Sequence, residues 1–223
     1  MYRIFLLDID NTLLDFDAAE EQGFIKMIQS YDLEYNDEML SQYKKMNRHL
    51  WDLLEQGKIG REELLNTRFH EFFRLYDTEI SGEEAEGRYR EHLGNNSDLI
   101  PGAKETLIKL KQMGKQLYTA SNGVYSTQIQ RLKNAGIYHL FEGMFISEQV
   151  GYEKPSLYFF QHCFNNIQNF EKDKTIMVGD SLSSDIQGAV NAGIDSCLFN
   201  RSLETLPTGA THTIHDISQL LNF

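Results

Sequence analysis

Residues 3–13 read RIFLLDIDNTL, a short apolar run that leads directly into two aspartates, Asp8 and Asp10. A continuous apolar run of this length is typical of a strand buried on both faces of a parallel sheet. Two carboxylates this close repel each other, and burial raises the free energy of both charges. The stretch therefore predicts a buried strand that ends at a site able to neutralise negative charge.

After residue 96 the sequence alternates short apolar runs with amphipathic stretches. We expect Pro101 to open a helix that runs to about Gly114. This alternation indicates parallel β-α-β units with right-handed crossovers. We therefore expect an α/β fold, a Rossmann-like parallel sheet with helices on both faces. Further strands are expected in KQLYTAS, GMFIS, KTIMVGD, DSCLFN and THTIH, and further helices in VYSTQIQRLKNAG, KPSLYFFQHCFNNI, SSDIQGAVNAG and at the C-terminus.

The segment 15–96 interrupts this alternation, because it is rich in helix formers with 3.6-residue spacing and carries no clear strand. A β-α-β unit takes as few as about 30 residues, so the segment is too long for a simple crossover. We expect a core of residues 1–14 and 97–223 and an inserted four-helix cap domain of residues 15–96. The predicted cap helices cover roughly 17–31, 36–56, 60–76 and 82–94.

The composition is that of a compact folded protein, with 41% hydrophobic residues among 223 and a formal net charge of -12. An acidic surface argues against binding to a nucleic-acid polymer, but not against a small phosphorylated substrate. The chain has no signal peptide and no stretch long enough for a membrane span, so a cytoplasmic protein is expected. Cys163 and Cys197 are expected to be buried thiols. Nothing demands more than a monomer or a weak homodimer.

Polar residues stand where several of the predicted strands end, and one lysine lies in the loop before a helix. They are Asp8, Asp10, Ser121, Lys154, Asp180 and Asp185. In open parallel sheets, ligands bind at the carboxyl ends of the strands. If these strands are adjacent, the carboxylates require a cation, and oxygen ligands suit Mg²⁺.

The spacing of Asp8 and Asp10 suits a division of labour between two carboxylates. Strand residues i and i+2 point to the same face, so the two side chains are expected to start out aimed together. One can act as an ionised nucleophile and the other as a general acid and then a general base. Phosphoryl transfer fits this pair, with Mg²⁺ and Lys154 neutralising the phosphoryl oxygens and Ser121 holding the group.

The stretches DIDNTL, TASNG, EKP and GDSLSSD follow one another in this order along the chain. They resemble the four motifs of the haloacid dehalogenase (HAD) superfamily, and the helical insertion resembles the C1 cap of its subfamily I. The resemblance implies a Mg²⁺-dependent phosphomonoester hydrolase with an aspartyl-phosphate intermediate. It implies Asp8 as nucleophile, Asp10 as general acid/base, Lys154 as catalytic, Thr12, Ser121, Asn122 and Lys154 as phosphate-binding, and Asp8, the Asp10 main-chain oxygen and Asp180 as metal ligands, with Asp185 close behind.

A finer resemblance lies in MNRHLW, NTRF and FISEQVGYEKP. These stretches resemble the YjjG/YfnB-type branch of pyrimidine 5′-nucleotidases, which implies a nucleoside monophosphate as substrate. Ser121 stands where that branch often has threonine. The hydroxyl is kept, so the implied chemistry is unchanged.

Three residues of the expected cap have two readings each. Asn47 and Arg68 fall within apolar helical stripes and therefore need polar partners. The partner is either another cap residue, such as Glu21 or a backbone carbonyl, or a ligand. In the second case Asn47 and Trp51 would lie near the base and Arg68 near the phosphate.

Three rival functions remain at this stage. A dehalogenase has no use for a leaving-group acid, so Asp10 argues against it. A phosphomutase, or a phosphatase for phosphoglycolate or a sugar phosphate, would keep all four motifs. A non-catalytic binding protein on the same scaffold would be expected to have lost a motif residue, and none is missing.

Overall fold

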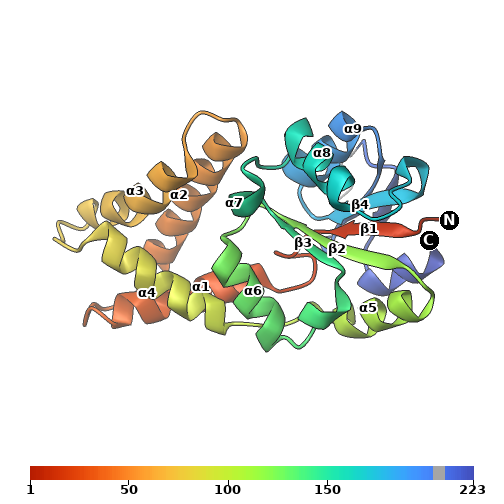
Figure 1. Ribbon diagram of the computed structural model, residues 1–223. Coiled ribbons are helices and arrows are strands. Elements are labelled where there is room, and N and C mark those ends of the chain that lie inside the picture. Colours follow the sequence, from red (N-terminus) through yellow and green to blue (C-terminus); the bar gives the residue numbers. More distant parts are fainter. Residues whose placement is uncertain (203–208) are drawn as a thin grey trace. The chain divides into compact units, whose positions relative to one another are not determined.

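The structure is a computed structural model that describes residues 1–202 and 209–223. The chain divides into two compact units, residues 1–16 with 97–223, and residues 17–96 (Figure 1). Their assignment to a catalytic core and a cap stays a prediction. Among the described residues, no helix has the length and apolar character needed to cross a membrane.

The first unit is built on a six-stranded sheet in the order β3-β2-β1-β4-β5-β6, in which every pair is parallel. The predicted α/β fold is therefore confirmed. The first strand of the chain lies in the interior of the sheet, between the second and the fourth. The strands are β1 (Ile4–Leu7), β2 (Gln116–Ser121), β3 (Gly143–Ile146), β4 (Thr175–Gly179), β5 (Asp195–Phe199) and β6 (His212–Ile214).

Helices cover both faces of this sheet, and alternate residues of β1 belong to the hydrophobic clusters on its two faces (Figure 1). Phe5 and Leu7 pack with α5 (Ala103–Gln112), α6 (Tyr125–Asn134) and η4 (Ile217–Asn222), whereas Ile4 and Leu6 pack with α8 (Leu157–Asn166) and α9 (Gln187–Ala192). Successive strand residues point to opposite faces, so a strand covered on both sides must be apolar throughout. Short helical turns complete the unit: η1 (Tyr138–Leu140), α7 (Ser147–Val150) and η2 (Lys172–Lys174).

The helix predicted in SSDIQGAVNAG begins with a wider turn than expected. A π-helical turn, η3 (Leu182–Ile186), precedes α9. The N–H groups of Asp185 and Ile186 both donate to the carbonyl of Ser181, and the Ser181 hydroxyl accepts from the N–H of Ser184. Such turns are frequent at functional sites. Here the turn brings the Asp185 carboxylate back against the end of β4.

The second unit consists of the four predicted helices. An aromatic cluster joins them: Tyr43 stacks on Phe24 and on Phe69, with ring centroids 4.6 Å and 5.2 Å away, and the ring of Tyr89 lies edge-on to it at 5.7 Å. The side chains of Asn36 and Ser81 cap the helices that follow them. The helices are α1 (Phe16–Gln29), α2 (Asp37–Glu55), α3 (Arg61–Arg74) and α4 (Gly82–Asn95).

Candidate active site

Asp8 lies at the carboxyl end of β1, where the chain order of the strands reverses direction in the sheet. Its N–H donates to the carbonyl of Val178 at 2.9 Å, which extends the pairing of β1 with β4 by one residue. The strands β2 and β4 end on either side of it, at Ser121 and Gly179. Such a switch point is where ligands bind in open α/β sheets.

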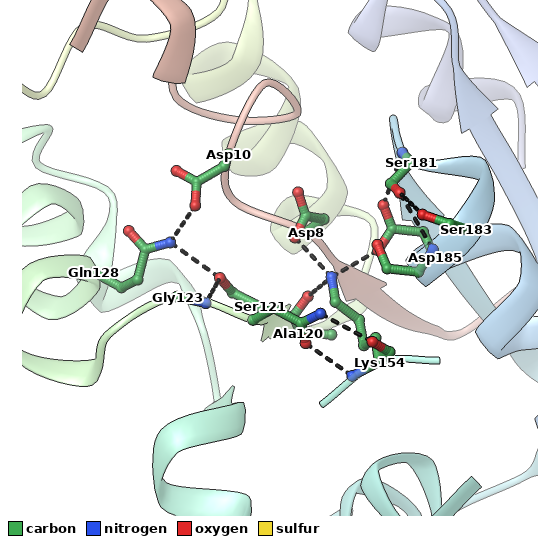
Figure 2. A network of polar contacts seen from close by, with 12 residues as sticks. Asp8, Asp10, Ala120, Ser121, Gly123, Gln128, Lys154, Ser181, Ser183 and Asp185 are labelled. Carbon is green, nitrogen blue, oxygen red and sulfur yellow. Dashed lines mark hydrogen bonds and ion pairs between the residues drawn. The ribbon is translucent and has the colours of Figure 1, made fainter. Parts of the chain in front are cut away.

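Lys154 is the cation at this point, and its ammonium group is buried. Nζ donates to Asp8 Oδ1 at 2.7 Å, to Asp185 Oδ1 at 2.6 Å and to the carbonyl of Ala120 at 2.6 Å (Figure 2). An ammonium group has three N–H donors, so all three are in use. Burial lowers the pKa of Lys154, but the carboxylates of Asp185 and Asp8 outweigh burial and hold this pKa above its ordinary value.

Three carboxylates converge beside this lysine. One oxygen each from Asp8, Asp180 and Asp185 lies within 4.8 Å of the others. Burial raises the pKa of Asp8 well above its usual range; Lys154 opposes the rise, and Asp185 and Asp180 add to it. Burial, followed by the Asp185 carboxylate, raises the pKa of Asp180 to about 7. Burial is thus the main cause of both rises, and the neighbouring carboxylates add to it, so ionisation of these groups without a bound cation is disfavoured.

The donor set fits a divalent cation. In their ionised forms, the three carboxylates together with the one ammonium would sum to two negative charges, which one divalent ion would neutralise. The ligand atoms are all hard oxygens, the type that Mg²⁺ takes in proteins. The predicted acidic cluster is therefore present, and Asp185 belongs to it as directly as Asp8 and Asp180 do.

Asn122, predicted to bind phosphate, is hydrogen-bonded to the backbone of Lys154. Its Nδ2 donates to the Lys154 carbonyl at 3.0 Å, and its Oδ1 accepts from the Lys154 N–H at 2.8 Å. The amide thus fixes the loop that carries the lysine to the end of β2. That Asn122 also binds phosphate stays a prediction.

The two predicted hydroxyl groups differ in their surroundings. Ser121 Oγ accepts from the N–H of Gly123 at 3.1 Å and from Gln128 Nε2 at 3.0 Å. Thr12 is completely buried, and within residues 1–202 and 209–223 its hydroxyl has no hydrogen-bond partner. Of the two, Ser121 is the hydroxyl held in a defined orientation by its neighbours.

Asp10 belongs to a different network from Asp8. Its carboxylate accepts from Gln128 Nε2 at 2.6 Å and forms an ion pair with Arg131 Nη1. Figure 2 shows Asp10 turned towards Gln128 and Asp8 towards Lys154. Sequence reasoning missed both partners on α6. The signal was available, since Gln128 and Arg131 are polar residues in a helical stripe with Leu132 and Ala135.

The three candidates of the helical unit contact other residues of that unit. Arg68 donates through Nε and Nη2 to both carboxylate oxygens of Glu86, at 2.6 Å and 2.8 Å, and through Nη1 to Asn47 Oδ1 at 2.9 Å. Asn47 in turn donates to Glu20 at 2.8 Å, so its partner is another residue of the helical unit, although not Glu21. The guanidinium of Arg61 lies 5.6 Å from the ring centroid of Trp51. That these residues touch a substrate stays a prediction.

Comparison with known proteins gives a consistent result. A family model described as haloacid dehalogenase-like hydrolase matches residues 2–193. The solved structure of the HAD-hydrolase YfnB from Bacillus subtilis, bound to magnesium, has a TM-score of 0.93 at 36% identity and covers 99% of this chain and 97% of its own. Pyrimidine 5′-nucleotidase PynA of Streptococcus pneumoniae is 35% identical over 99% of this chain and 95% of its own.

Pyrimidine 5′-nucleotidase YjjG of Escherichia coli is 29% identical, covering 96% of this chain and 95% of its own. The similarity extends along the chain and includes all four stretches that carry the polar residues of the site. The four stretches resemble the superfamily's motifs, and the family model, the relatives and the fold agree with that resemblance. The chain therefore belongs to the haloacid dehalogenase-like hydrolases.

Proposed function

We propose that this protein is a Mg²⁺-dependent phosphomonoesterase that acts through an aspartyl phosphate on Asp8 and prefers pyrimidine nucleoside 5′-monophosphates. The observation that carries the proposal is the contact of the buried Lys154 ammonium with Asp8, inside a cluster of carboxylates with the charge and ligand type for one magnesium ion. A cation site built around a carboxylate that is itself held by a lysine suits nucleophilic attack on a phosphoryl group.

In the first half of the reaction, an Asp8 oxygen forms a bond to phosphorus. The bond from phosphorus to the ester oxygen breaks, its electron pair goes to the leaving oxygen, and Asp10 supplies the proton that makes it a hydroxyl. In the second half, Asp10 takes a proton from water, the water oxygen bonds to phosphorus, and the electron pair of the breaking bond returns to Asp8. Each carboxyl group ends in its starting state.

The residues also account for the electrostatics of this chemistry. Asp8 must be ionised to attack, although burial raises its pKa. Lys154 favours the ionised form by its direct contact. Asp8, Asp180 and the main-chain oxygen of Asp10, with Asp185 beside them, would hold Mg²⁺, which when bound neutralises charge on the phosphoryl oxygens.

The preference for pyrimidine nucleotides rests on the relatives PynA and YjjG, which are pyrimidine 5′-nucleotidases and match nearly the whole chain. The similarity includes the helical unit, residues 17–96, which we propose acts as the cap that selects the leaving group. Phosphoglycolate and sugar phosphates are the alternative substrates. A dehalogenase is disfavoured because it has no use for a leaving-group acid, whereas the Asp10 carboxylate is held by Gln128 and Arg131.

The test is a phosphatase screen with Mg²⁺ over nucleoside monophosphates, sugar phosphates and phosphoglycolate, run beside Asp8→Asn. We expect the highest kcat/KM with pyrimidine nucleoside monophosphates and a loss of activity with every substrate in the variant. Sugar phosphates that clearly exceed every nucleotide would overturn the proposed substrate. An Asp8→Asn enzyme as active as the wild type would overturn the proposed nucleophile.

A further inference from the structure

We propose that Arg131 and Gln128, two buried residues of α6, are positioning residues for Asp10 and couple it to the hydroxyl of Ser121. The proposal rests on the proposed function, in which Asp10 transfers protons and Ser121 binds the phosphoryl group. The helix α6 begins just after the TASNG stretch and carries none of the four motifs itself. The proposal gives two of its residues a role in positioning Asp10.

The Asp10 carboxylate is held through both of its oxygens. Arg131 Nη1 pairs with Oδ1, and Gln128 Nε2 donates to Oδ2 at 2.6 Å. The Arg131 side chain is 1% exposed, whereas that of Asp10 is 29% exposed. One donor per oxygen defines the plane and direction of the carboxylate, while its exposed side stays open to a reacting molecule.

The Gln128 amide is held in one orientation by Arg131. Its Oε1 accepts from Arg131 Nη1 at 3.0 Å, so its NH₂ group must face Asp10 and Ser121. The opposite orientation would place the amide oxygen against the Asp10 carboxylate and the NH₂ group against the guanidinium. Arg131 therefore acts on Asp10 twice, once directly and once by fixing Gln128.

The Ser121 hydroxyl is oriented by these contacts as a hydrogen-bond donor. Ser121 Oγ accepts from Gly123 N–H and from Gln128 Nε2, which occupies both of its lone pairs. Its own O–H is then a donor, the polarity that a phosphoryl oxygen requires. Because the same Gln128 NH₂ group reaches Asp10 and Ser121, it sets the proton-transfer group relative to the phosphate-binding hydroxyl (Figure 2).

A purely structural role for the buried guanidinium makes a different prediction. General acid assistance matters for a leaving group that is a poor anion, such as a nucleoside 5′-oxygen, and matters little for p-nitrophenolate, which leaves without a proton. A general loss of folding or of nucleophile geometry would slow both substrates by the same factor. The ratio of kcat/KM for the two substrates therefore separates positioning of Asp10 from structural support.

The experiment compares uridine 5′-monophosphate with p-nitrophenyl phosphate at saturating Mg²⁺, for the full-length wild type, Arg131→Gln, Gln128→Met and the control Lys133→Gln. Lys133 is an exposed cation of the same helix. We expect the nucleotide-to-aryl ratio of kcat/KM to fall at least about tenfold in Arg131→Gln and in Gln128→Met, since general acid catalysis contributes about 10²–10⁴-fold. The ratio should be unchanged in Lys133→Gln.

A second measurement asks whether Arg131 acts through Asp10. In an Asp10→Asn background, adding Arg131→Gln should lower the ratio no further. If Arg131→Gln does not fold, Gln128→Met carries the same test. Equal losses with both substrates, or a further fall of the ratio in the double variant, would overturn the positioning role. A wild type that hydrolyses p-nitrophenyl phosphate but no nucleotide would instead overturn the proposed substrate, and the ratio would then be measured with its preferred alkyl phosphate. A wild type inactive towards both would overturn the two proposals together.

Discussion

Gly179, the last residue of β4, is the position where one added methyl group tests the geometry of the site. A Cβ placed there would lie 2.0 Å from Asp185 Oδ2 and 2.2 Å from its Cγ. The strand cannot move aside easily, because β4 is hydrogen-bonded to β1 on one side and to β5 on the other. In Gly179→Ala the Asp185 carboxylate must therefore leave its position.

The size of the effect follows from what Asp185 contacts. Its Oδ1 accepts from Lys154 Nζ at 2.6 Å and its Oδ2 from the Ser181 N–H at 3.1 Å. Hydrogen bonds to charged groups contribute about 1.5–3 kcal/mol each. Breaking a buried ion pair such as Lys154–Asp185 costs about 3–5 kcal/mol of stability. Hydration of a displaced Asp185 carboxylate would offset part of this cost. We expect the free energy of unfolding to fall by about 3 kcal/mol, and the midpoint of thermal unfolding to fall by about 6–12 °C.

The assay is thermal unfolding of Gly179→Ala with and without Mg²⁺, combined with phosphatase kinetics. We expect lower stability, weaker stabilisation by Mg²⁺ and at least a tenfold lower kcat, about 1.4 kcal/mol of activation free energy. Gly87→Ala is the matched control, because Gly87 lies on α4 with nothing within 4 Å of an added Cβ. That variant should gain about 0.5–1 kcal/mol of stability. A Gly179→Ala protein with wild-type Mg²⁺ response and activity would refute the geometry.

Three further predictions concern the metal, the lysine loop and the helical unit. Mg²⁺ at a hundred times its Kd should raise the free energy of unfolding by about 2.7 kcal/mol in a denaturation series, and Asp180→Asn should abolish that gain; a full gain in the variant would contradict the ligand set. Asn122→Ala should lower the free energy of unfolding by about 2 kcal/mol, one kcal/mol for each lost hydrogen bond to the Lys154 backbone, and should lower kcat; unchanged kcat would show that the loop is fixed without it. Burial raises the pKa of Glu20 in the folded protein above its value in the unfolded chain. The contribution of Glu20 to the free energy of unfolding therefore falls as the pH rises from the unfolded-state pKa through the folded-state pKa. Glu20→Gln removes this ionisation and keeps an oxygen that can accept the hydrogen bond from Asn47. In urea unfolding, the free energy of unfolding of Glu20→Gln minus that of the wild type should therefore increase with pH. A difference independent of pH would contradict the raised pKa.

The features that could be predicted from the sequence are those set by chain order and strand direction. The apolar run before Asp8 identified an interior strand, and parallel β-α-β units bring strand ends to one edge, so Asp8, Lys154 and Asp180 could be placed together before any contact was known. The four helices of the inserted segment followed from 3.6-residue spacing, because their apolar stripes are continuous.

The features that could not be predicted depend on how side chains meet across the fold. The pairing of Arg131 with Asp10 depends on the rotation of α6 against the sheet, which a stripe of residues does not specify. The close approach of Asp185 to Gly179 depends on a π-helical turn, whose hydrogen bonds have no distinct sequence pattern. Asn122 stands within a motif expected to bind phosphate, and only the structure shows its amide on the backbone of Lys154.

In the proposed mechanism Asp8 becomes covalently phosphorylated. The direct measurement is to mix the enzyme with Mg²⁺ and phosphate-labelled uridine 5′-monophosphate, quench the reaction in acid within the first turnover, and map the label by peptide mass spectrometry. We expect one phosphoryl group on Asp8, stable in acid, released by hydroxylamine, and absent in Asp8→Asn. Turnover with no labelled protein, or with the label on another residue, would contradict it.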